Sequence, residues 1–181
     1  MIPIEVFLAC GMIAFGMVGL SRGLSRELGA TAGFIAMILG LVLLGGRVGP
    51  VAARGLHIAG FDVTQDLAAW VAITAVIFGT VLAVYHGDTL TIHALPSPGP
   101  AGKILDAGAG LLNGWLVLGT WWYATHNLGY PMSKIGLYQG EISDRALHMI
   151  DFTPLAVLPD ERALVYVSVA LVSLIGLKVV R

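Results

Sequence analysis

The sequence has little cysteine and little charge, and each shortage narrows the kinds of protein that it can encode. It contains one cysteine, Cys10, which lies inside an apolar run. A single thiol cannot form an internal disulfide, and the Cys-x-x-Cys spacing of redox and metal sites is absent. Charged residues make up 12% of the chain, against ~25% in a typical soluble domain. The net charge of −1 also excludes the strong basic field on which nucleic-acid-binding proteins depend.

What the sequence has in abundance is apolar residues, which make up 57% of the chain and give a mean hydropathy of +0.86. Five apolar runs approach the ~20 residues that a helix needs to cross a bilayer. These runs are residues 3–20, 28–46, 67–85, 104–123 and 163–180. We therefore predict an all-α integral membrane protein. Residues 1–181 are expected to form a single membrane domain with four to five transmembrane helices.

Two connections between the runs contain strong helix breakers. Gly49 and Pro50 interrupt the second helical pattern, so we expect that helix to end near Gly46. The weakly amphipathic residues 51–58 are then expected to lie along the membrane interface. Leu95–Pro100 holds three prolines, which favour an extended turn between the third and fourth helices.

The longest connection, residues 126–160, is predicted to hold an interfacial amphipathic segment. Its central helix is expected at Ser143–Ile150, with the Ser143 side chain as the N-cap. The direction of insertion stays open. Arg22 and Arg26 favour a cytoplasmic first loop, but Lys and Arg are evenly divided between the two sides overall.

Glycines recur at helical spacing in three of the predicted membrane helices. Small residues allow backbones to approach closely in lipid, where helix association depends on packing. The positions are Gly19 and Gly23 in the first helix, Gly29, Gly33 and Gly40 in the second, and Gly110 and Gly114 in the fourth. We expect the second and fourth helices to meet closely, with the first alongside. The alternative is that glycine is simply frequent in membrane helices.

Arg22, Arg26 and Glu27 form the densest charge cluster, directly after the first apolar run. Two interpretations stay open. The cluster is either a solvated turn that binds anionic lipid head groups, or an interaction surface for a partner near the membrane. The two arginines are four residues apart, so they would share a helix face.

Two polar residues fall inside the fourth apolar run. Asp106 lies one turn into it, where a carboxylate is costly and needs a partner. Lys103, three residues earlier, would supply a local ion pair, and a buried functional acid is the alternative. Asn113 lies deeper and is expected to hydrogen-bond across helices.

No constellation of catalytic or metal-binding residues is visible, so we predict a non-enzymatic protein without a metal site. The metalloprotease, nucleophile-elbow and phosphate-loop motifs are absent. No two histidines share the i, i+4 spacing of a metal site. Trp121, Trp122 and Tyr123 are typical of the aromatic belt at a head-group boundary. No cofactor is predicted, while bound lipid or pigment stays open.

Three segments carry a family resemblance. Gly19–Leu28 resembles the "RG-x-x-RE" junction of the colicin V production protein family. Gly102–Gly114 is similar to the glycine-rich start of that family's fourth helix, and Ile142–Pro159 to its tail. The order and spacing of the three segments hold over about two-thirds of the chain. Glu5, Lys103, Asp106 and Asn113 depart from the family pattern, and the fifth run extends beyond its four-helix core.

The resemblance implies a small multi-pass protein of the bacterial inner membrane with a role in bacteriocin production or envelope homeostasis. It implies no enzymatic activity and no substrate. We expect the protein to act through helix–helix contacts, in envelope or secretion functions or as an accessory subunit of a larger membrane complex, such as a respiratory or photosynthetic one. Its partners would be membrane lipids, other membrane subunits or a second copy. The alternative is a small transporter or channel in which Asp106 lines an oligomeric polar path.

Overall fold

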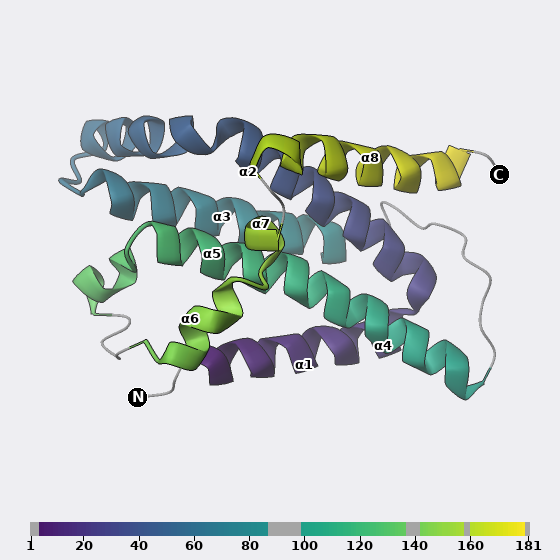
Figure 1. Cartoon of the computed structure of the whole chain (residues 1–181). Helices are drawn as coiled ribbons and strands as arrows, with labels where there is room; N and C mark the ends of the chain where they lie inside the picture. The colour runs from purple at the N-terminus through teal and green to yellow at the C-terminus, as the bar shows by residue number, and fades with distance from the viewer. Residues whose placement is uncertain (1–3, 87–98, 137–141, 158–159, 180–181) are drawn as a thin grey trace.

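The computed structural model describes residues 4–86, 99–136, 142–157 and 160–179, and these ranges contain helices and no strands. Figure 1 shows the long helices packed side by side into a bundle, with short helices folded along one flank. In chain order the elements are α1 (Ile4–Arg22), α2 (Leu24–Ile58), α3 (Gln65–His86), α4 (Pro100–Gly114), η1 (Trp115–Gly119), α5 (Thr120–Asn127), η2 (Pro131–Ile135), α6 (Asp144–Ile150), α7 (Pro154–Val157) and α8 (Asp160–Val179).

Three of the helices, α1, α2 and α3, are long and apolar enough to cross a membrane. The predicted runs at 104–123 and 163–180 are helical as well. However, a π-helical turn, η1, divides the fourth helix, and the apolar part of α8 is the shorter stretch Val165–Gly176. The coarse prediction of an apolar helical bundle is confirmed, and the fourth and fifth crossings stay a prediction.

The predicted break in the second helix is wrong, because α2 continues through Pro50 to Ile58. Pro50 has no amide hydrogen, so the carbonyl of Gly46 loses its intrahelical partner, but the turn does not have to unwind. Just before the proline, Gly49 packs against Gln65 and Ala69 of α3, and this contact holds α2 on α3 beside the lost hydrogen bond. The 35 residues of α2 span ~52 Å, well beyond a ~30 Å hydrocarbon layer.

Glycines set the closest helix contact, which joins α1 to α4 rather than α2 to α4 as predicted. Gly19 and Gly110 face each other so closely that a methyl group on either would collide with the other helix's backbone. Gly114 continues this contact against Phe15. Figure 1 shows α1 and α4 as neighbours and α3 beside α2. The α2–α4 contact exists but is less extensive, since α2 packs mainly on α3.

The glycines predicted to pack α2 behave differently from one another. Gly29 is buried, and a methyl group at Gly33 would lie 2.7 Å from a methyl of Val84 in α3. A methyl group at Gly40 would meet nothing within 4 Å, so no close approach within the described chain requires glycine there. Gly23 separates α1 from α2 and has a φ of 80°, a left-handed conformation that glycine adopts readily.

The segment after α5 folds back along the bundle. The Ser143 hydroxyl caps α6 by accepting a hydrogen bond from the Ala146 amide at 3.1 Å, as the sequence predicts. The apolar face of α6, which includes Ile150, packs in a cluster with Leu8 of α1. Figure 1 shows α6 near the start of α1 and α7 against the middle of the α4–α5 helix. The described part of the 126–160 connection therefore packs on the bundle itself.

Most of the predicted turn at Leu95–Pro100 lies outside the described residues. Its last residue, Pro100, is the first residue of α4, a position where the missing amide hydrogen costs nothing. Gly99 before it has a φ of 86°.

Candidate functional site

The main polar feature of the bundle is a cluster built around Glu27, whose side chain is 0% exposed. Glu27 lies in the first turn of α2. Because a single residue, Gly23, separates α1 from α2, the start of α2 folds directly onto the end of α1. The Glu27 carboxylate therefore faces α1, α3 and α4 instead of solvent. An unpaired carboxylate in such a setting would be strongly destabilising.

Three side chains from three other helices satisfy this carboxylate. Its Oε2 accepts hydrogen bonds from the Asn113 amide at 2.7 Å and from the Tyr85 hydroxyl at 3.1 Å. Its Oε1 lies 3.2 Å from Nε of Arg22, which forms an ion pair with it. The Arg22 contact is one of charge proximity, because Nε and Oε1 do not meet in good hydrogen-bond geometry.

Arg22 makes two further contacts in the cluster, both with Tyr85. Its Nη1 donates to the Tyr85 carbonyl at 3.1 Å, and its guanidinium lies 4.4 Å from the centre of the Tyr85 ring. A cation over an aromatic face gains electrostatic stabilisation, the more so where water is scarce. The Arg22 side chain is 19% exposed, so the cluster reaches the surface on this side.

Asn113 of α4 and Thr31 of α2 close the cluster on its inner side. The Thr31 hydroxyl lies 2.7 Å from the Asn113 carbonyl oxygen and 2.9 Å from the Glu27 backbone carbonyl. The Asn113 amide nitrogen also donates to that backbone carbonyl at 3.0 Å. Asn113 thus uses both its donor and its acceptor on α2, which is the cross-helix bonding expected of it.

Asp106 stands next to the cluster and caps α2 from a different helix. Its Oδ1 accepts a hydrogen bond from the Leu24 amide at 2.8 Å. Gly23, at the N-cap position, has no side chain that could do this. The other oxygen, Oδ2, lies 3.8 Å from the Lys103 ammonium, which also reaches the Leu20 carbonyl at 3.4 Å.

The structure therefore brings together residues that are widely separated in sequence: Arg22, Glu27, Asp106 and Asn113 lie at one end of the bundle. Arg26 is exposed on α2. Both interpretations of the Arg22–Glu27 segment are wrong for Glu27, which forms neither a solvated turn nor an interaction surface. The reason is that partners from α3 and α4 cover it, and the local sequence gives no sign of them.

Two members of the cluster, Tyr85 and Thr31, are not predicted by the sequence. Tyr85 ends an apolar run beside His86, a position typical of an interfacial aromatic residue, and Thr31 is one small hydroxyl among apolar neighbours. A threonine four residues after a glutamate falls on the same helix face, and this spacing is the one signal that could have joined Thr31 to Glu27.

The chemistry available to the cluster is charge neutralisation and hydrogen bonding. Among the described residues, no group of three His, Cys, Asp or Glu side chains could hold a metal ion. The carboxylate, guanidinium, phenol and amide instead bind one another and connect α1, α2, α3 and α4. Comparison with protein-family models, with curated proteins and with solved structures gave no match.

Proposed function

We propose that the chain is a non-enzymatic, multi-pass membrane protein whose helix bundle acts by contact with other membrane proteins. The observation that carries this proposal is the Glu27 cluster, which uses its polar groups on one another and joins four helices. A buried polar network of this kind fixes one arrangement of helices. It leaves the outer apolar faces as the surfaces through which the protein meets lipid and partners.

The outer surface supports a role within the bilayer. Large apolar side chains are exposed on several helices, including Ile13 of α1, Phe78 of α3 and Val172 of α8. Such a surface is stable against hydrocarbon, whereas in water apolar patches of this extent drive association. Three helices with the length and composition to cross a membrane agree with this location.

The resemblance to the colicin V production family supports the finer proposal of a bacterial inner-membrane protein in envelope or secretion functions. Two of the segments that carry the resemblance, Gly19–Leu28 and Gly102–Gly114, pack on each other. They share the Gly19–Gly110 contact, the Asp106 cap and the Asn113–Glu27 hydrogen bond. The Gly19–Gly110 contact joins positions that follow the family pattern and supports the resemblance, whereas the contacts of Asp106 and Asn113 use positions that depart from it.

The alternative proposal, a transporter or channel that uses Asp106, has weaker support. Both carboxylate oxygens of Asp106 are engaged, one by the Leu24 amide and the other by Lys103. A residue that lines a path for ions has to exchange partners freely, and a helix cap does not. Loss of flux through reconstituted Asp106→Asn protein would nevertheless favour transport.

Site-specific photo-crosslinking in cells tests the proposal. A photoreactive amino acid would replace Ile13, Phe78 or Val172 on the outer faces, and the buried Phe34 would serve as the matched control. We expect at least one outer position to form a discrete adduct with another membrane protein or a second copy, and Phe34 to form none. Adducts with lipid alone at all three outer positions would contradict the proposal.

A further inference from the structure

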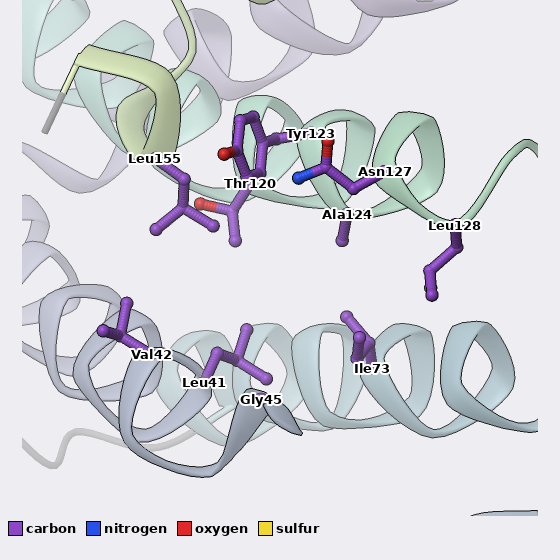
Figure 2. A pocket seen from close by; sticks show the side chains of 10 residues that line it. All are labelled: Leu41, Val42, Gly45, Ile73, Thr120, Tyr123, Ala124, Asn127, Leu128 and Leu155. Carbon is purple, nitrogen blue, oxygen red and sulfur yellow. The ribbon is translucent and has the colours of Figure 1, made fainter. Parts of the chain in front are cut away.

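A pocket of about 380 Å³ lies at the other end of the bundle, between α5, α2 and α3. This volume falls within the ~300–1,000 Å³ typical of small-molecule sites. Figure 2 shows two unlike walls. Thr120, Tyr123 and Asn127 project from α5 on one side, while Leu41 and Ile73 face them from α2 and α3.

The lining contains hydrogen-bonding groups but no charged side chain. All of the residues around the pocket are aliphatic or uncharged: Leu41, Val42, Gly45, Ile73, Thr120, Tyr123, Ala124, Asn127, Leu128 and Leu155. A phosphate or carboxylate would therefore enter without a counter-charge, which is costly in a site of low polarity. The lining instead favours a neutral polar group attached to hydrocarbon.

The hydroxyl of Thr120 identifies which neutral group fits. Thr120 is 0% exposed, and its Oγ1 has no hydrogen-bond partner in the described structure. Three other helical threonines return this hydroxyl to the carbonyl four residues earlier: Thr31 to Glu27, Thr80 to Val76 and Thr125 to Trp121.

The π-helical turn before Thr120 explains why its hydroxyl differs from the others. The carbonyl four residues earlier belongs to Leu116, which lies inside η1. Hydrogen bonds in a π-helix run from residue i to i+5, so the carbonyls there are displaced from their α-helical positions. Single π-helical turns within α-helices are frequent at functional sites. Thr120 is thus left with a donor that needs an acceptor from elsewhere.

We propose that this pocket binds one ester-linked acyl chain of a membrane glycerolipid, with the ester carbonyl accepting a hydrogen bond from Thr120 Oγ1. The chain would lie between Leu41 and Ile73 of the aliphatic wall, and Tyr123 and Asn127 would face the polar glycerol region. In Figure 2 the Thr120 hydroxyl is directed toward Leu155 of the four-residue helix α7. The Leu155 side chain would move aside as the carbonyl enters. The proposal is independent of the function proposed above.

The test compares two photoreactive phospholipids that differ only in the ester or ether linkage of the labelled chain. The full chain is reconstituted in vesicles of phosphatidylethanolamine and phosphatidylglycerol that contain a trace of one probe. Mass spectrometry then measures labelling of the peptides that hold α5 and residues 41–45. An ether cannot replace the carbonyl acceptor, so the wild type should label about fivefold more with the ester, as one neutral hydrogen bond predicts.

Three variants locate the effect. Thr120→Val keeps the shape and removes the hydroxyl, so it should abolish the preference for the ester probe. Thr80→Val on α3 is the matched control and should keep it, because its hydroxyl is bonded within its own helix and lies outside the pocket. Leu155→Ala should increase labelling by the ester probe.

Equal labelling of the wild type by the two probes would overturn the proposal. This result can be interpreted without any variant. An unchanged preference in Thr120→Val would also overturn it. Displacement of the ester probe by a short-chain quinone at equal concentration would assign the carbonyl to a quinone, and the glycerolipid proposal would fail.

Discussion

The Asn113 amide donates a 2.7 Å hydrogen bond to the Glu27 carboxylate across 86 residues of sequence. This bond joins α4 to α2 in the interior of the bundle. Both side chains are 0% exposed, so water cannot replace either one when the other is removed. The pair therefore offers a direct way to measure what the polar cluster contributes to stability.

Asn113→Ala should lower the free energy of unfolding by ~1–3 kcal/mol, because a buried carboxylate loses a donor and Thr31 loses an acceptor. Thermal unfolding in a mild detergent measures the change. Asn113→Asp would place a second carboxylate beside Glu27 and should be worse than alanine. Wild-type stability in both variants would contradict the role assigned to the cluster.

Arg22→Ala should destabilise the protein by about 3–5 kcal/mol, since it leaves the Glu27 charge without its counter-charge. The double variant Arg22→Met with Glu27→Met should recover part of this loss, because it removes the unpaired charge but leaves the Tyr85 hydroxyl without its carboxylate acceptor. Arg47→Ala, at an exposed arginine further along α2, is the control and should change stability by less than ~0.5 kcal/mol. The same unfolding measurement serves all three, and a double variant as unstable as Arg22→Ala would contradict the interpretation.

Gly110→Ala should weaken or separate the α1–α4 contact, because its methyl group would collide with the Phe15 carbonyl. Gly108→Ala is a matched control on the same helix, where a methyl group would meet nothing within 4 Å. Cysteine crosslinking between the two helices, together with the unfolding temperature, reports the separation. Identical behaviour of the two variants would show that glycine at 110 is not needed for close approach.

Asp106→Ala should cost about 1 kcal/mol, the usual value of a lost N-cap. Asp106→Asn keeps an oxygen that can accept from the Leu24 amide, so it should be close to wild type in stability. Flux measurements on the reconstituted asparagine variant then separate the two roles of this residue. A cap predicts no change in flux, and a path-lining acid predicts its loss.

The sequence predicts the positions of the helices well, because long apolar runs leave few alternatives to helix in a bilayer. It also predicts the Ser143 cap, since that signal is local. The continuation of α2 through Pro50 could not be predicted, because Gly49, next to the proline, is held by a tertiary contact with Gln65 and Ala69 of α3.

The burial of Glu27 is a larger difference from the sequence prediction than the continuation of α2 through Pro50. Arg22, Arg26 and Glu27 have the composition of a hydrophilic turn, and nothing near them in sequence indicates otherwise. Tyr85 and Asn113, which bury the carboxylate, are distant in the chain and meet it only after α3 and α4 have packed. The second and fourth helices were predicted to meet, with the first alongside; they do meet, but the closest glycine contact joins α1 to α4. The spacing of glycines shows which face of a helix carries small residues, but it does not show which other helix packs against that face.

Gly23 alone joins α1 to α2, and this shortness constrains how the chain enters a membrane. A one-residue connection is too short for the helices to enter separately, so we expect α1 and α2 to be inserted together as a hairpin. Arg22 and Glu27 are part of that hairpin and can neutralise each other before Tyr85 and Asn113 have been synthesised. We therefore expect Arg22 and Glu27 to arrive in the bilayer already as a neutral pair, with the later helices assembling around them.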